Sequence, residues 1–158
     1  MKVIKVIQLA KENDLEMVAG ETGLDKPVTE VMISRPGIEL AGFMEFFDPE
    51  RVILIGSKEA SFLNLLDASL QEKRLTEIFK LNPPALIFST NVEIKDIFIK
   101  LGNKYHVAIL KSKLRTTALN SKLYSYLQEN LAKRQTVHGV LMDINGMGTL
   151  IIGKSGIR

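Results

Sequence analysis

The sequence contains no cysteine and no tryptophan, and only 6% of its residues are aromatic. The absence of cysteine excludes disulfide bonds, thiolate zinc sites and cysteine nucleophiles, and it is compatible with a reducing compartment. With so few aromatic rings there is no stacking platform beside the basic residues. We therefore expect no nucleic-acid partner, despite the net charge of +3.

Long apolar runs are also missing. No uninterrupted run approaches the roughly 18 residues that a membrane-spanning helix needs. The first segment, MKVIKVIQLAKEND, reaches Lys5 before any long apolar core and has no small-residue cleavage site, so it does not have the form of a signal peptide. Hydrophobic and charged shares of 46% and 25% are those of a soluble globular protein. We predict a cytoplasmic protein with no membrane association.

The order of the apolar segments predicts an α/β fold. Continuous apolar runs bounded by turn residues have the pattern of strands buried on both faces, at 51–57, 85–90 and 106–112. Helical segments follow them, at 58–70, 74–81, 93–104 and 116–131. A helix at 2–12 and strands at 15–20 and 27–34 are expected before this unit. The alternation predicts a layered domain with a mainly parallel sheet flanked by helices.

The end of the chain does not continue this alternation of strands and helices. Two strands joined around Asn145-Gly146 are expected over 137–153, because this dipeptide is a hairpin signal. We therefore predict a domain boundary near 130–136. It separates an α/β domain at 1–131 from the opening β-hairpin of a second domain at 132–158.

A phosphate-loop pattern overlaps the last strand. Residues 148–155, GTLIIGKS, match G-x-x-x-x-G-K-[ST] literally. The four residues between the glycines, TLII, prefer an extended strand to the curl that cradles phosphate. In a second register the strand leads into Gly153-Lys154-Ser155-Gly156, which is the strand-to-loop context that the motif requires. There the second required glycine falls on Arg158. A polar tail after a strand remains the other interpretation.

Several stretches together resemble the bacterial HPr kinase/phosphorylase family. They are VAGETGLDKPVTEVMISRPGIELAGF, FFDPERVILIGSKEASFLNLL, PALIFSTN and VHGVLMDINGMGTLIIGKSGI, and the resemblance covers nearly the whole chain. It implies a bifunctional enzyme of carbon-catabolite regulation. Such an enzyme phosphorylates a serine of HPr, the phosphocarrier of the sugar phosphotransferase system, using ATP or pyrophosphate, and removes that phosphate by phosphorolysis. It also implies Mg²⁺, a hexamer, an N-terminal α/β domain and a C-terminal P-loop kinase domain.

The resemblance assigns roles to particular positions. His138 is similar to the family's active-site histidine. The first half of the phosphate loop corresponds to Gly153, Lys154, Ser155, Gly156 and Ile157. Arg158 departs from the family's glycine, and its side chain would crowd the close approach of backbone to phosphate. We expect the kinase domain to be truncated within this loop, and the 158 residues alone to be inactive.

Other polar residues have simpler interpretations. We interpret His106 as structural or exposed, and Asp143 as a turn residue rather than a metal ligand. Asp48, Glu50 and Glu59 have no spacing that suggests paired acid–base work, so capping or solvation is expected.

The sequence also predicts how two helices begin or end. Ser57 is expected to cap the helix after the first buried strand, and Gly102 to end the helix at 93–104. The basic stretch KSKLRTT (111–117) is interpreted as a solvated helix start, although it could grip a phosphate or an acidic partner. The alternative to an enzyme is a non-catalytic regulatory or interaction module that oligomerises or binds a small ligand.

Overall fold

The computed structural model describes residues 3–132. The predicted hairpin, the phosphate loop and most of the expected second domain lie outside the described residues. The elements are β1 (Ile4–Lys5), α1 (Val6–Glu12), β2 (Glu16–Ala19), a 3₁₀ turn (Glu21–Gly23), β3 (Pro27–Val28), β4 (Ile33–Ser34), a second 3₁₀ turn (Ile38–Ala41), β5 (Val52–Ile55), α2 (Ser57–Asn64), α3 (Ala68–Lys80), β6 (Ala85–Phe88), α4 (Asp96–Tyr105), β7 (Ala108–Lys111), α5 (Thr116–Leu127) and a π-helical turn (Gln128–Ala132).

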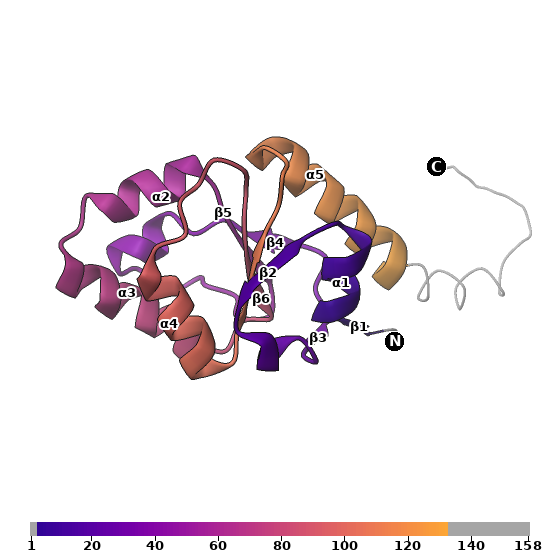
Figure 1. The fold of residues 1–158 in the computed structure, drawn as a ribbon, viewed down its shortest axis with the longest axis horizontal. Coiled ribbons are helices and arrows are strands. Elements are labelled where there is room, and N and C mark those ends of the chain that lie inside the picture. The colour runs from indigo at the N-terminus through magenta and orange to yellow at the C-terminus, as the bar shows by residue number, and fades with distance from the viewer. Residues whose placement is uncertain (1–2, 133–158) are drawn as a thin grey trace, which may run out of the picture.

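The main sheet has the strand order β2-β7-β6-β5-β4. The pairs from β4 to β7 are parallel, and only β2 joins antiparallel, beside β7. Helices α2, α3 and α4 lie on one side of the sheet, and α1 and α5 lie on the other (Figure 1). The predicted α/β class and the mainly parallel sheet are confirmed.

The strands are buried on both faces, as their sequences predict. In β5, Val52 and Leu54 belong to the core cluster that contains α1 and α5. Ile53 and Ile55 belong to the cluster on the side of α2, α3 and α4. Successive side chains of a strand point to opposite faces, so a continuous apolar run supplies both cores. Each such buried side chain stabilises the fold by about 1.5–3 kcal/mol relative to exposure.

The single strand predicted at 27–34 is wrong. The chain forms two short strands there that belong to different sheets. β3 pairs antiparallel with β1, through Val28 opposite Ile4, whereas β4 pairs parallel with β5, through Ile33 opposite Val52. The residues between them carry the chain from one sheet to the other, so no continuous strand can form.

The predicted helix break is misplaced. Sequence periodicity favoured helices at 58–70 and 74–81, but α2 ends at Asn64 and α3 runs without interruption from Ala68 to Lys80. Asp67 is the N-cap of α3, and its Oδ1 accepts a hydrogen bond of 2.8 Å from the Leu70 N–H. This cap satisfies an otherwise unpaired first-turn donor and restarts the helix.

Gly102 lies inside α4 rather than at its end. A Cβ at this position would lie 2.6 Å from Ile109 Cγ1, so the absence of a side chain lets α4 lie close against β7. The helix ends instead at Tyr105, followed by His106 in the left-handed conformation at φ 59°. The His106 Nδ1 and the Thr22 hydroxyl are 2.7 Å apart, which agrees with the structural role predicted for this histidine.

Helix α5 confirms most of the predicted segment at 116–131. The buried positions of this segment are Leu119, Leu123, Leu127 and Leu131. Tyr126 is different, because its hydroxyl donates a hydrogen bond of 2.6 Å to Glu12 Oε1 at the end of α1. Burial, this hydrogen bond and the Glu12 charge raise the pKa of Tyr126. The bond joins the two helices of one layer.

Candidate functional site

The connections between strands single out one edge of the sheet. After β5 and β6 the chain turns toward α2 and α4, whereas after β7 it turns toward α5 on the opposite side (Figure 1). In open parallel sheets, ligands bind outside the carboxyl ends of the strands, where neighbouring connections leave to opposite faces. The expected position is therefore between the loops that leave β6 and β7.

A cavity of about 290 Å³ lies at this position. We call it the carboxyl-edge crevice, and its lining residues are Ser57, Thr90, Asn91, Arg115 and Thr116. Ser57 follows β5, Thr90 and Asn91 follow β6, and Arg115 and Thr116 follow β7. The lining contains one cation, three hydroxyl groups and one amide, but no carboxylate.

Hydrogen bonds hold the two loops of the crevice together. The Thr90 N–H donates to the Leu114 carbonyl at 2.8 Å, and the Ser112 N–H donates to the Phe88 carbonyl at 2.8 Å. The Ser89 and Thr116 hydroxyl oxygens are also 2.8 Å apart. Ser89 is only 1% exposed, so this bond satisfies a buried polar group. The wall of the crevice is thus tied to the end of β6.

The turn after β5 also borders the crevice. Gly56, not Ser57, is the N-cap of α2, so the predicted serine cap is wrong; Ser57 is the first helical residue. The Gly56 N–H donates to Glu59 Oε1 at 2.8 Å, which confirms the capping role expected for Glu59. A Cβ on Gly56 would lie 2.5 Å from Thr116 Oγ1. This close approach brings the start of α2 against the start of α5.

The two arginines around the crevice differ in their ion pairs. Arg35, which follows β4, forms an ion pair of 3.3 Å with the buried Glu59 carboxylate. Arg115, in contrast, has no carboxylate partner among residues 3–132. Lys113 belongs to the same basic stretch but lines a different cavity, of about 150 Å³, beside Asp14. The cations of the basic stretch therefore line different cavities, and Arg115 is the one that lines the crevice.

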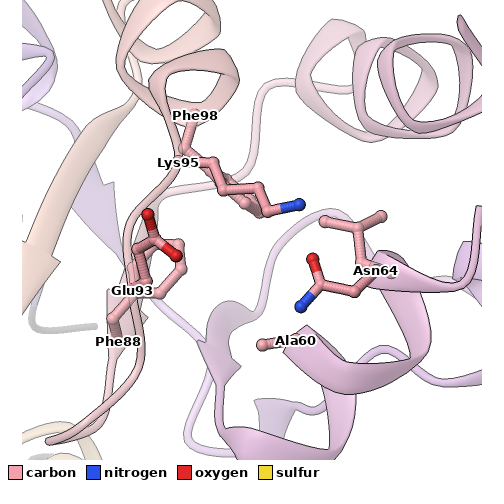
Figure 2. A pocket seen from close by; sticks show the side chains of 7 residues that line it. Ala60, Asn64, Phe88, Glu93, Lys95 and Phe98 are labelled. Atoms are coloured by element: carbon pink, nitrogen blue, oxygen red, sulfur yellow. The ribbon is translucent and has the colours of Figure 1, made fainter. Parts of the chain in front are cut away.

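A smaller cavity of about 50 Å³ lies between α2 and the loop that leads into α4. Its floor is apolar, and Phe88 and Phe98 meet there edge to face, with ring centroids 4.9 Å apart. Figure 2 shows Lys95 and Asn64 reaching into the space between the two elements, with Glu93 on the strand side. Its small size and its two rim charges of opposite sign suit a water-filled gap better than a ligand site.

Lys26 lies at the opposite, amino edge of the sheet, in a cavity of about 240 Å³. Its ammonium group donates to Asn82 Oδ1 and to the Pro83 carbonyl. Burial lowers the pKa of Lys26 from 10.5 to about 8. The two acceptors explain why the amine is held here despite this desolvation.

The candidate residues from the sequence fall into two groups. His138, Asp143, Arg158 and the loop residues Gly153, Lys154, Ser155, Gly156 and Ile157 lie outside the described residues. Asp48 accepts a hydrogen bond from the Glu50 N–H at 2.9 Å and pairs with Arg51 at 3.4 Å, as expected of a solvated turn carboxylate. Within 3–132, no three His, Asp or Glu side chains gather as metal ligands would.

Sequence reasoning missed Thr90 and Asn91 and interpreted Ser57 only as a cap. A usable signal was present, since each of these polar residues closely follows a buried apolar strand. The carboxyl ends of parallel strands meet at one edge, so such residues are brought together by the fold.

Comparison with known proteins identifies the family. The family model described as "HPr Serine kinase N terminus" matches residues 4–127. The chain belongs to this family. It is 38% identical over 157 residues to the HPr kinase/phosphorylase of Bacillus subtilis strain 168, and 38% identical over 157 residues to that of Bacillus pumilus strain SAFR-032. It is 42% identical over 155 residues to the HPr kinase/phosphorylase of Streptococcus sanguinis strain SK36.

The matches cover a larger share of this chain than of its relatives. The matches cover 98–99% of this chain but only 50–51% of each relative, so the chain spans about half their length. The similarity to B. subtilis continues beyond residue 127, where the family model ends. In the part of the chain that the structure describes, no helix has the length and apolarity to cross a membrane.

Proposed function

We propose that the chain forms the N-terminal half of an HPr kinase/phosphorylase. The proposed reaction transfers a phosphoryl group from ATP or pyrophosphate to a serine of the partner protein HPr, and the reverse process removes it by phosphorolysis. The supporting observation is the similarity to the B. subtilis relative, which reaches 99% of this chain rather than the N-terminal domain alone. The proposed setting is the cytoplasm, in a homohexamer.

The two parts of the chain would contribute differently. For residues 1–131 we propose a regulatory and assembly role, because the crevice offers a cation and hydroxyl groups but no paired acid and base. Residues 132–158 would begin the kinase domain. There Gly153–Ile157 would contribute backbone N–H groups toward the phosphates of ATP with Mg²⁺, and His138 would lie at the active site.

A chimeric enzyme tests this function. Residues 1–157 replace the matching segment of the B. subtilis HPr kinase/phosphorylase, whose own sequence continues from the position of Arg158, and phosphorylation of HPr is followed with ATP and Mg²⁺. We expect a folded, hexameric chimera that phosphorylates HPr and releases pyrophosphate from the phosphorylated protein when inorganic phosphate is supplied. A chimera of native secondary structure and hexameric size that lacks both activities would overturn the proposal.

The two histidines of the chain provide a matched pair of variants. His138→Asn in the chimera should lower kcat by about 10²-fold or more, as expected for loss of a group acting in proton transfer. His106→Asn should leave kcat unchanged, because this position ends α4 and contacts Thr22, and asparagine tolerates its left-handed conformation. Equal losses in both variants would contradict the assignment of His138.

A further inference from the structure

We infer that the carboxyl-edge crevice binds a small phosphate monoester. Its residues differ from those of the phosphate loop proposed above, because they follow β5, β6 and β7. It goes beyond the proposed phosphotransfer, since it gives the N-terminal domain a ligand of its own.

The charge of the lining selects an anion. Arg115 presents a planar guanidinium with several N–H donors, which matches the oxygens of a phosphate group. Within residues 3–132, no carboxylate forms an ion pair with Arg115, and none lines the crevice. The charged side chain of the lining is therefore a cation, which favours a ligand of negative charge.

Hydroxyl groups supply the remaining donors. Ser57, Thr90 and Thr116 follow three different strands and line the same cavity. The Thr116 hydroxyl is held by its hydrogen bond with the Ser89 hydroxyl, and the backbone of Thr90 is held through its N–H bond to Leu114. A set of donors held in advance loses little conformational freedom when a phosphate binds.

Two helices begin at the crevice, and neither first turn is capped by a side chain of its N-cap residue. The N-cap residues are Gly56 for α2 and Arg115 for α5. The unpaired first-turn N–H groups and the helix dipoles add to the attraction that Arg115 and the hydroxyl groups exert on an anion. Although α2 and α5 lie on opposite sides of the sheet, the first residue of each helix, Ser57 or Thr116, lines the same cavity.

The size of the crevice indicates more than a bare ion. Its volume of about 290 Å³ corresponds to nearly ten water molecules, at ~30 Å³ each. Inorganic phosphate would leave part of this space filled by water. A phosphate monoester with a small hydroxylated group fills it better, and the amide of Asn91 at the rim can bond to such a group.

An NMR titration of the full 158-residue chain tests this inference. Glycerol 3-phosphate and inorganic phosphate are added at constant ionic strength, with glycerol and sodium chloride as controls. We expect saturable shifts of the backbone amides at Ser57, Thr90, Asn91 and Thr116, stronger binding of the monoester than of inorganic phosphate, and no such shifts with the controls. Absence of saturable shifts with both phosphates would overturn the inference.

Two substitutions test whether the ligand binds within the crevice. Arg115→Gln should weaken binding by about tenfold or more, since a hydrogen-bonded charge is lost. Lys113→Gln is the matched control, because it removes the same charge two residues away in a different cavity, and binding should be retained. If both variants weaken binding equally, the attraction is only general charge and the crevice is not the site.

Ser57→Asp provides a variant that keeps the fold. Aspartate is favourable in the first turn of a helix, so α2 is expected to remain intact. The new carboxylate would repel phosphate within the crevice and abolish the saturable shifts. Unchanged affinity in a folded Ser57→Asp variant would contradict the inference.

Discussion

The contact between Gly56 and Thr116 is the tightest structural requirement of the crevice, and Gly56→Ala tests it. The new Cβ would lie 2.5 Å from Thr116 Oγ1 and 2.8 Å from Thr116 Cγ2. The backbone itself accepts alanine, because Gly56 has φ −110°. Any loss of stability must therefore come from the lack of space.

The expected magnitude follows from what Thr116 must give up. To admit the methyl group, its side chain has to rotate away and lose the bond to Ser89, which costs about 1 kcal/mol. A displaced rotamer costs about 0.5–1.5 kcal/mol more. The lower entropy of the unfolded alanine chain offsets roughly 0.4–1 kcal/mol of this. The net loss is about 0.5–2 kcal/mol, or a decrease in Tm of roughly 1–8 °C for a chain of this size.

Thermal unfolding followed by circular dichroism measures this effect. Repeating the substitution in a protein that also carries Thr116→Ala identifies its cause. Thr116→Ala removes the two closest atoms that meet the new methyl group and leaves Glu59 Oε1 at 3.2 Å, so Gly56→Ala should cost much less in a protein that already carries Thr116→Ala. Gly37→Ala is the control elsewhere, because no atom lies within 4 Å of its added Cβ. If Gly56→Ala lowers Tm equally with and without the Thr116 side chain, the reasoning from this contact is refuted.

Two further predictions concern the amino edge of the sheet and helix α3. Because the pKa of Lys26 is lowered from 10.5 to about 8, the folded state binds fewer protons than the unfolded state between these values, and stability should rise with pH there. Lys26→Met should flatten the increase in Tm between pH 8 and 10, and an unchanged slope would contradict the burial of this amine. Asp67→Ala should destabilise the protein by about 0.5–2 kcal/mol in urea unfolding, since the Leu70 N–H loses its cap; Asp67→Asn should retain most of the stability.

The parts of the fold that the sequence predicted correctly are those set by local pattern. The run Val52–Ile55 is apolar at every position, and a strand covered on both faces is the structure that buries all four side chains. The leucines of α5 recur at helical spacing and are buried as expected. Each of these signals lies within one segment of the chain.

The errors arise where a distant segment decides the outcome. Gly102 resembles a helix stop in sequence, but its role depends on Ile109, which lies across the contact between α4 and β7. Val28 and Ile33 both suit a strand, but their pairing partners are in different sheets. Neither distinction is present in the local sequence, because propensity does not specify the partner.

The same difference separates the two phosphate sites proposed for this chain. Residues 153–157 could be proposed from sequence because a phosphate loop uses the N–H groups of consecutive residues, so its pattern is local. The crevice is built from Ser57, Thr90 and Arg115, each beyond the end of a different strand, and no local pattern connects them. The basic stretch at 111–117 therefore looked like a solvated helix start. Only the parallel pairing of β5, β6 and β7 gives Arg115 its hydroxyl neighbours, and that pairing is what turns a charged segment into a candidate binding site.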